Sequence, residues 1–341
     1  MDHPVLTNRS ARNKLPSCIH MATYIQQILS SVLSGTHIDR KTALKLASEN
    51  DQEALWNAAD QARRYFHSSR FSLCSIINAK SGKCSEDCRF CAQSAQYHTD
   101  IDEYDIVDRD LALEIAEDNN HHGVHRLSLV TSGRTASLTL LDRLAVLYDK
   151  IGQSTSLHLC GSMGLLTDEK AARLKKMGVV RYHCNLEANR DFFQKVCTTH
   201  TWEEKVGTLR IAHEAGMSIC SGGIIGMGET MDDRIDLALE LRDLAVDSIP
   251  LNILTPIVGT PLDALEPLKT EEILTTIALF RLIYPKAVIR IAGGRQQMGK
   301  DRYRCFTSGA NGAMVGNYLT TIGSAIEDDL QAFRDIGFNF D

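Results

Sequence analysis

The chain of 341 residues lacks any long uncharged apolar run, and neither sign of charge dominates it. A membrane-spanning helix needs roughly 18 or more consecutive apolar residues, and the sequence has no such stretch. Residues 1–20 carry scattered polar and basic side chains and lack the apolar centre of a secretory signal peptide. The net charge is only -6, with acidic and basic residues mixed along the chain. These absences argue against a membrane protein, a secreted protein and a nucleic-acid-binding protein, so we expect a cytoplasmic location.

Cysteine, by contrast, occurs ten times. Disulfide bonds are rare in the reducing cytoplasm, and a chain of this length does not need them to hold its core together. The cysteines therefore predict metal binding or redox chemistry rather than a disulfide framework.

Short β-branched runs alternate with longer amphipathic stretches from residue 71 onward. This order is typical of βα units around a parallel sheet, and eight such runs predict a (β/α)8 TIM barrel in the α/β class. Gly178 and Gly216 end two of the amphipathic stretches, where a left-handed helix cap is expected. The expected strands are 71–78, 125–131, 156–161, 179–186, 217–221, 248–254, 287–292 and 312–316, and the expected helices include 111–119, 140–151, 168–177, 203–215, 232–244 and 271–284.

Further segments flank this barrel. We expect an amino-terminal helical extension over residues 1–70 with a helical run at 42–66, the barrel over 71–318, and a closing segment over 319–341 with a helix at 326–336. In a barrel of this kind the chemistry lies at the carboxyl ends of the strands. Motifs that directly follow a predicted strand are therefore the candidates for a functional site.

Three cysteines follow the first predicted strand within one short loop. Cys84, Cys88 and Cys91 have the spacing C-x3-C-x2-C, and thiolates that converge in this way bind either an iron–sulfur cluster or zinc. A structural zinc site takes four ligands, and the nearest candidate for the fourth is His98. Three cysteines would leave one iron of a 4Fe-4S cluster open. The alternatives are a zinc site and three cysteines that lie close together without a metal.

The cysteine spacing, with Phe90 directly before the last cysteine, resembles that of the radical S-adenosylmethionine (SAM) superfamily. In that superfamily the open iron binds the amino and carboxylate groups of SAM, and reduction cleaves SAM to a 5'-deoxyadenosyl radical. The resemblance implies that Phe90, Gly222, Ile224, Gly226 and Glu229 contact SAM, the last four from a glycine-rich turn after the fifth strand. Its glycines permit close backbone approach to a ligand, and they would equally serve a tight βα turn.

Further segments resemble the biotin synthase family, from about residue 73 to residue 337. They are residues 80–84, 91–94, 198–202, 220–224, 226–230, 250–253, 259–261, 290–295 and 309–311. The resemblance implies sulfur insertion between two unactivated carbons of dethiobiotin, with two SAM-derived radicals that abstract hydrogen atoms. It also implies an auxiliary iron–sulfur cluster that donates the sulfur, a small redox protein as electron donor, and a homodimer.

The family holds its auxiliary cluster, a 2Fe-2S centre, with three cysteines and one arginine. The matching positions are Cys160, Cys220 and Arg290, whereas the position of the remaining cysteine is occupied by Ser128. A serine hydroxyl is a harder and far less acidic ligand than a thiol, so it should hold iron less well. The auxiliary cluster is therefore expected to be either of the 2Fe-2S type or a variant of it.

His183 is a hypothetical replacement for the missing cysteine. Strand alternation places His183 on the same face as Asn185 and Glu187, and the resemblance implies that Asn185, Glu187 and Asn252 contact the substrate. We therefore hypothesise that His183 is a ligand of the auxiliary cluster or a hydrogen-bond donor to it. The alternative is a buried histidine that is satisfied by a neighbouring group.

Plainer explanations exist for several of these residues. Arg290 lies in an apolar strand and would form an ion pair with Glu187 or with the SAM carboxylate. Cys160 and Cys220 would pack as small core residues. The cysteines without an expected ligand role are Cys18, Cys74, Cys184, Cys197 and Cys305.

Two other classes of protein compete with the expected sulfur-inserting enzyme. One is a different radical SAM enzyme on the same scaffold, such as a relative of the hydrogenase maturases, which would not rescue biotin auxotrophy. The other is a metal-binding protein without catalysis, which would contain metal but would not cleave SAM.

Overall fold

The structure, a computed structural model, describes residues 17–316 and 326–340. Residues 1–16 of the expected extension and the expected boundary between residues 318 and 319 lie outside this part. The described residues form one nine-stranded sheet in the order β5-β4-β3-β2-β1-β9-β8-β7-β6, closed by a further pairing of β5 with β7. The strands, all parallel, are β1 (Ser72–Lys80), β2 (Arg126–Thr131), β3 (His158–Ser162), β4 (Arg181–His183), β5 (Ser218–Cys220), β6 (Gly223–Ile225), β7 (Ser248–Ile253), β8 (Val288–Ile291) and β9 (Gly312–Met314).

The expected fifth strand at 217–221 is replaced by two short strands, β5 and β6, which share one place in the barrel. β5 pairs with β4 and, through Cys220, with β7, while β6 continues beside β7. The break falls at Gly222. A Cβ atom on Gly222 would lie 1.9 Å from the carbonyl oxygen of Pro250, so only glycine permits this approach. The (β/α)8 barrel is confirmed, with an interruption in its fifth strand.

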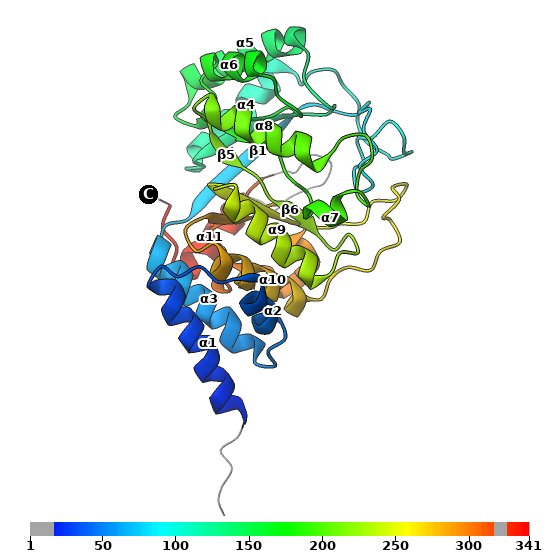
Figure 1. The fold of residues 1–341 in the computed structure, drawn as a ribbon. Helices are drawn as coiled ribbons and strands as arrows, with labels where there is room; N and C mark the ends of the chain where they lie inside the picture. Colours follow the sequence, from blue (N-terminus) through cyan, green and yellow to red (C-terminus); the bar gives the residue numbers. More distant parts are fainter. Residues whose placement is uncertain (1–16, 317–325, 341) are drawn as a thin grey trace, which may run out of the picture.

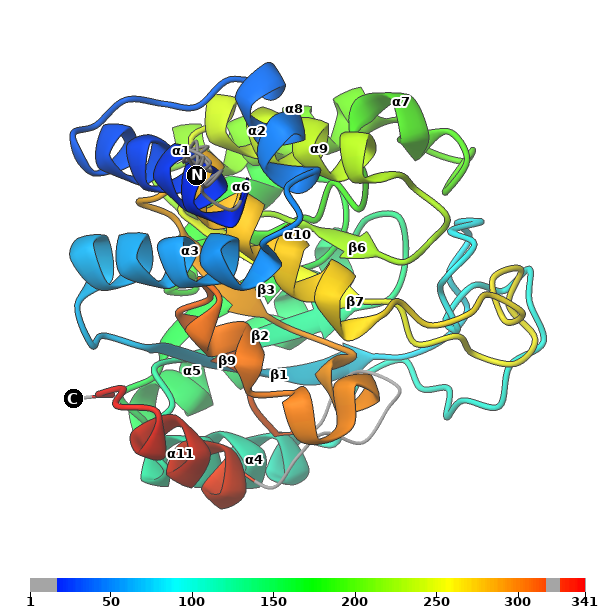
Figure 2. The ribbon, with the colours of Figure 1, turned by 90° about the horizontal axis from the view of Figure 1, so that it is seen from below.

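Helices cover the outside of the barrel (Figures 1 and 2). The six expected helices are present, and the φ angles of 85° at Gly178 and 79° at Gly216 confirm the two left-handed caps. The helices after β1 are α4 (Arg109–His121), α5 (Leu138–Ser154), α6 (Asp168–Lys176), α7 (Arg190–Phe193), α8 (Trp202–Glu214), α9 (Met231–Asp243), α10 (Thr270–Ile283), the 3-10 helices η1 (Arg295–Asp301) and η2 (Arg304–Thr307), and the closing helix α11 (Ile326–Asp335).

The helical run expected at 42–66 is wrong as a single element, because two helices replace it. These are α2 (Arg40–Ala47) and α3 (Gln52–His67), and a helix α1 (Ser17–Leu33) precedes them. The Asp51 carboxylate accepts a hydrogen bond from the backbone N–H of Ala54 at 3.0 Å, which starts α3 as an N-cap. In Figure 1, α1, α2 and α3 lie together beside α10. Since α3 packs against α10, residues 273–283 of α10 are buried on every side.

Strand β1 shows how the barrel divides its side chains between two environments. Buried and half-buried residues alternate along it. Leu73 and Ile77 belong to the apolar core between sheet and helices. Cys74 and Ile76 face the other way and line a cavity of about 460 Å³ inside the barrel. Among the described residues, no helix is both long and apolar enough to cross a membrane.

His67, at the end of α3, links stability to pH. Its Nε2 atom lies 2.9 Å from Arg281 Nη1 and 3.1 Å from the Pro285 carbonyl oxygen. Burial and the Arg281 charge lower the pKa of His67 from 6.5 to about 4. Between these two values the unfolded chain binds more protons than the folded one, so the stability supplied by the neutral ring is lost as the pH falls.

We therefore expect the free energy of unfolding to fall by up to ~3 kcal/mol between pH 6.5 and pH 4 through this residue. Urea unfolding of wild type and His67→Gln at several pH values measures it. The variant should lose this part of the pH dependence, and an identical pH slope in both proteins would contradict the assignment.

Candidate functional site

The barrel cavity runs from the interior of the sheet to the loops at the carboxyl ends of the strands. Its volume lies in the range of ligand and cofactor sites. Besides Cys184, two groups of cysteines line it. The outer thiols belong to Cys84, Cys88 and Cys91 in the loop after β1, and the inner thiols belong to Cys74, Cys160 and Cys220 on β1, β3 and β5.

The loop of the outer thiols folds back on itself. The backbone of Cys84 donates to the Gln93 carbonyl at 3.0 Å and accepts from Ala95 at 2.8 Å, and the Cys91 N–H donates to the Cys88 carbonyl at 2.9 Å. These turns direct all three thiols to one cavity, as their spacing predicts. Burial raises the pKa of Cys91 to about 11, so its thiolate form depends on a nearby positive charge such as iron.

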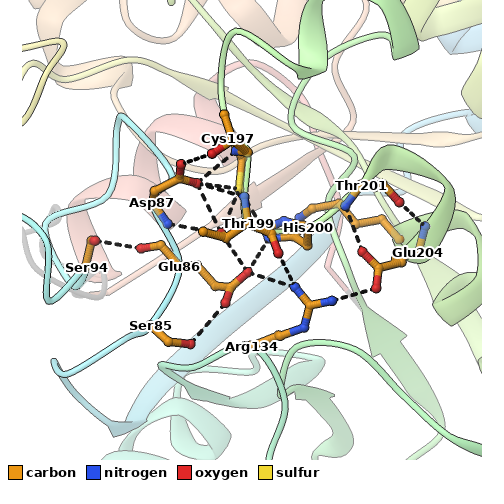
Figure 3. Close-up of polar contacts among 12 residues, drawn as sticks. Ser85, Glu86, Asp87, Ser94, Arg134, Cys197, Thr199, His200, Thr201 and Glu204 are labelled. Atoms are coloured by element: carbon orange, nitrogen blue, oxygen red, sulfur yellow. Dashed lines mark hydrogen bonds and ion pairs between the residues drawn. The ribbon is translucent and has the colours of Figure 1, made fainter.

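Two carboxylates in this loop attach it to residues 197–201 (Figure 3). Asp87 accepts hydrogen bonds from the backbone N–H groups of Thr198 at 2.9 Å and Thr199 at 3.2 Å. Glu86 lies 2.6 Å from Nδ1 of His200. Although burial opposes it, hydrogen bonds from Thr198 hold the pKa of Asp87 well below its usual range. We call Glu86, Asp87 and residues 197–201 the loop latch.

Arg134, which follows β2, ties the loop latch to α8 (Figure 3). Its guanidinium lies 3.3 Å from Glu86, donates to the Thr199 carbonyl, and lies 2.6 Å from Glu204. Glu204 also forms the capping box of α8 with Thr201. Part of the segment 198–202 that resembles the family therefore has a structural role, which is to hold the cysteine loop.

Asp87→Asn tests the latch, because an amide is a weaker acceptor than a carboxylate. Loss of charge-assisted bonds worth about 1.5–3 kcal/mol should speed amide hydrogen exchange at Thr198 and Thr199 by roughly tenfold to a hundredfold. Exchange measured by mass spectrometry or NMR gives the answer, with Asp105→Asn on an exposed part of the same loop as the matched control. Unchanged exchange in Asp87→Asn would show that the latch does not hold this segment.

The inner thiols include one residue that the sequence analysis missed. Cys160 and Cys220 are buried inside the barrel, where they were expected, and Cys74 lines the same cavity. Burial raises the pKa of Cys74, and the thiol also interacts electrostatically with Cys220. Cys74 precedes Ile76, the direct strand partner of Ser128, by two residues. Strand alternation could have indicated this position, because it places Cys74 on the face of β1 opposite the buried Leu73.

Three arginines surround the inner thiols. Arg290 was expected there, and Arg126 and Arg181 also line the cavity. Nη1 of Arg290 donates to the carbonyl oxygens of Ser72 at 2.8 Å and Ala313 at 3.1 Å. Nε of Arg181 donates to a serine hydroxyl at 2.9 Å. Nη1 of Arg126 is buried without a hydrogen-bond partner in the described part of the chain.

The ion pair considered between Arg290 and Glu187 is not present. Glu187 instead lies 3.7 Å from the ammonium of Lys205, which also donates to the Asn185 carbonyl at 2.9 Å. Lys205 is buried, on α8, and the sequence analysis missed it because a lysine on an amphipathic helix is usually exposed.

Ser128 on β2 and His183 on β4 both line the cavity that holds the inner thiols. The Ser128 hydroxyl is buried and has no hydrogen-bond partner among the described residues, and its strand partner on β3 is Cys160. Nδ1 of His183 lies 3.4 Å from Sγ of Cys220. Burial lowers the pKa of His183 to about 4, so the ring is neutral near pH 7 and has a free lone pair for a metal.

The expected substrate residues line the cavity above the inner thiols. The side-chain oxygen of Asn185 accepts from the Gly222 N–H at 3.0 Å, and its amide donates to Glu187 at 3.2 Å. The side-chain oxygen of Asn252 accepts from the Gly293 N–H at 3.0 Å. Both asparagines therefore fix the backbone at the carboxyl ends of neighbouring strands.

The residues expected to contact SAM separate into two groups. Phe90 and Ile224 line the cavity, whereas Gly222, Gly226 and Glu229 are not part of its lining. The Glu229 carboxylate accepts from the backbone N–H groups of residues 226 and 227 at 2.7 Å each, and it pairs with the buried Arg234 at 2.6 Å. Glu229 thus holds the shape of the turn after β6 rather than reaching into the cavity.

The donor groups fit two iron–sulfur centres at different depths. Three outer thiols in one loop suit a cluster with one open iron, and three inner thiols on separate strands suit a second one. The interior also contains buried polar atoms without partners in the described chain, namely Ser128 Oγ, Thr131 Oγ1 and Arg126 Nη1. Such atoms are costly when left unsatisfied, and a bound anionic centre would give them partners.

Comparisons with known proteins agree with this arrangement. Residues 79–241 match the Radical SAM superfamily, and residues 250–339 match the Biotin and Thiamin Synthesis associated domain. A biotin synthase from Desulfotalea psychrophila is 50% identical over 92% of this chain and 95% of its own length. One from Heliobacterium modesticaldum is 47% identical over 94% of this chain and 99% of its own length.

Solved structures share the fold at low sequence identity. Methylornithine synthase (PylB) has a TM-score of 0.80 at 17% identity and covers 92% of this chain and 96% of its own. The FeFe-hydrogenase maturase HydG from Carboxydothermus hydrogenoformans has a TM-score of 0.77 at 16% identity and covers 94% of this chain and 80% of its own.

The closed barrel, with a cysteine triad in the loop after its first strand, defines a radical SAM enzyme. Within this class, an identity of 47–50% over more than nine tenths of the chain settles the family. The chain belongs to the biotin synthase family.

Proposed function

We propose that this chain converts dethiobiotin to biotin by radical SAM sulfur insertion. The observation that carries the proposal is the pair of thiol groups at two depths of one cavity, which the expected substrate residues Asn185, Glu187 and Asn252 also line. A second radical SAM activity of the maturase type has less support, because the likeness to HydG is 16% identity and extends to the fold alone.

Cys84, Cys88 and Cys91 would hold a 4Fe-4S cluster at the mouth of the barrel, where SAM would bind beside Phe90 and Ile224. When bound, these groups supply a carbon-centred radical, and a second iron–sulfur centre supplies the sulfur. The chain provides the enclosure, since a barrel interior keeps stray hydrogen-atom donors away from the radical. Lys205, paired with Glu187, holds the carboxylate in place at the cavity wall.

For the inner centre we propose Cys74, Cys160 and Cys220 as thiolate ligands. Cys74 supplies the soft sulfur ligand that Ser128 cannot, which removes the need for a serine–iron bond. The surrounding guanidinium groups of Arg126, Arg181 and Arg290 suit a negatively charged cluster. A 2Fe-2S cluster or a variant of it would fit this set, and Arg290 stays a candidate ligand.

His183 and Ser128 then take secondary roles at the inner centre. His183, at 3.4 Å from Cys220 Sγ, would donate a hydrogen bond to the thiolate or ligate iron directly. An auxiliary-cluster spectrum that is the same in His183→Ala and wild type would exclude both roles.

The electron donor, the oligomeric state and the location are inferred from the likeness to the family. We infer a small redox protein as electron donor, a homodimer and a cytoplasmic location. The nine cysteines whose side chains the structure describes are all free thiols, which agrees with a reducing compartment.

The two-centre proposal predicts that iron survives removal of the outer thiols. We expect a Cys84→Ala/Cys88→Ala/Cys91→Ala protein, reconstituted with iron and sulfide without oxygen, to keep the iron of the inner centre, because its ligands lie on other strands. Mössbauer spectra with iron and sulfide counts measure this. If all iron disappears with the outer thiols, the sulfur-donor assignment fails and a single-cluster enzyme takes its place.

Adding Cys74→Ala to this triple variant should lower the remaining iron, because the inner centre loses one of three thiolates. Adding Cys305→Ala instead is the matched control, since Cys305 is buried in the apolar core beside Met298 and does not line the cavity. Equal iron in the two quadruple variants would remove Cys74 from the ligand set.

Growth of a biotin auxotroph tests the reaction itself. Wild type and Cys305→Ala should rescue growth on dethiobiotin, whereas Cys74→Ala and Cys84→Ala should reduce it by at least tenfold, because each removes a cluster ligand. Growth is followed as colony number or doubling time. Failure of the wild-type chain to rescue, with SAM cleavage intact in vitro, would favour another radical SAM reaction.

A further inference from the structure

A cysteine and a histidine of the loop latch lie beside one of the outer thiols. Cys197 Sγ, His200 Nδ1 or Nε2 and Cys88 Sγ all lie within 4.8 Å of one another. Cys197 and His200 stand between α7 and α8, and Cys88 comes from the loop after β1. Two segments more than a hundred residues apart thus bring two soft sulfur ligands and one nitrogen ligand together.

The spacing of these atoms suits a single metal ion. In a tetrahedral zinc site, with bonds of about 2.0–2.3 Å, ligand atoms lie roughly 3.3–3.8 Å from each other. Cys197 Sγ and His200 Nδ1 are 3.2 Å apart in the structure. Because all three atoms lie within 4.8 Å of one another, adjustments of about 1 Å or less would bring them to this spacing.

Two carboxylates lie close enough to complete the ligand set. Glu86 Oε2 lies 2.6 Å from His200 Nδ1, and Asp87 Oδ1 lies 3.1 Å from Cys197 Sγ (Figure 3). A metal ion would replace the protons that these hydrogen bonds now share. Either carboxylate, or a water molecule, would then serve as the fourth ligand.

The surrounding charge supports a cation with two thiolates. The buried Lys205 lines the same cavity as Cys88 and His200. Arg134 lies 3.3 Å from Glu86 on the other side. Lys205 and Arg134 are themselves paired with Glu187 and Glu204, so a divalent ion is the charge that would offset the two thiolates.

We propose that Cys88, Cys197 and His200 form a binding site for a single divalent transition-metal ion, zinc above all, in the chain that lacks its 4Fe-4S cluster. Hydrogen bonding within the loop latch alone would not require two sulfur atoms beside an imidazole. The site shares Cys88 with the outer thiols. Because one thiolate cannot complete both centres, zinc here and the 4Fe-4S cluster exclude each other, a consequence that rests on the proposed function.

Cobalt binding tests the site. The full-length chain is freed of iron with a chelator under anaerobic, reducing conditions and titrated with Co²⁺ alone. We expect one bound ion with tetrahedral d–d absorption and sulfur-to-cobalt charge transfer, displaced by Zn²⁺. Cys197→Ser and His200→Gln should each weaken Co²⁺ binding at least tenfold, while Cys84→Ser/Cys91→Ser should bind it as tightly as wild type.

The matched controls are Cys305→Ser, a buried cysteine elsewhere in the core, and His213→Gln, an exposed histidine on α8. Both should bind Co²⁺ like wild type. Circular dichroism melting checks that each variant is folded. If Cys197→Ser or His200→Gln is unstable, Co²⁺ binding by Cys84→Ser/Cys91→Ser still tests the site.

Other results would overturn the proposal. Binding that survives in Cys197→Ser and His200→Gln but disappears in Cys84→Ser/Cys91→Ser would place the metal on the outer thiols alone. Loss in all of these variants would point to a different mixed ligand set, and no binding in wild type would remove the site.

Competition with the cluster is measured separately. One equivalent of Zn²⁺ added before iron and sulfide should slow assembly of the 4Fe-4S cluster in wild type, and it should slow it less in Cys197→Ser; equal slowing in both would refute the competition. Failure of zinc-free, reconstituted wild type to cleave SAM would count against the proposed function and would leave the cobalt result standing.

Discussion

Burial of charge inside the barrel is the constraint on which the rest of this structure depends. A TIM barrel is normally filled by layers of branched apolar side chains. Here Arg126, Arg181 and Arg290 line the same interior as three thiols, and a guanidinium in such a place needs negative partners. Backbone carbonyls of β1 and β9 satisfy part of Arg290, but the Nη1 atom of Arg126 finds none among the described residues. The interior is thus built for an anionic group rather than for close packing.

The same constraint orders the cavity by depth. Strand residues carry the inner thiols, because a strand holds its side chain at a fixed height and direction. A loop supplies the outer thiols, so it needs support from elsewhere in the chain. Asp87 and Glu86 give that support through hydrogen bonds to residues 197–201, and Arg134 extends it to the first turn of α8. The inner thiols are therefore held by the strands themselves, whereas the loop of the outer thiols is held by contacts with other segments.

Patterns that repeat locally were predictable from the sequence. Strand and helix positions follow from hydrophobic period, the caps at Gly178 and Gly216 from glycine chemistry, and the outer thiols from one short motif. The break at Gly222 was not predictable, since it reflects the approach of Pro250 from a strand that comes later in the chain. The break within the run at 42–66 was missed because Asp51 is equally compatible with an exposed position inside a helix.

Contacts between residues far apart in the sequence could not be predicted either. Cys74 looks like an ordinary strand cysteine until β1 is placed beside β2 and β9. Glu229 fits a SAM-contact motif by spacing, yet its partner Arg234 and the backbone of its own turn take up its oxygens. The loop latch joins residues about 110 positions apart, for which a single sequence carries no local signal.

The closure of the sheet between its first and last strands bears on how the protein is made. β1 pairs with β9, and the backbone N–H of Phe71 bonds to the carbonyl of Asn339, which follows much later in the chain. During synthesis, the thiols of β1, β3 and β5 therefore leave the ribosome well before the wall that encloses them can form. Nascent chains expose these metal-binding groups to the cell's metal ions and oxidants until β9 has been synthesised.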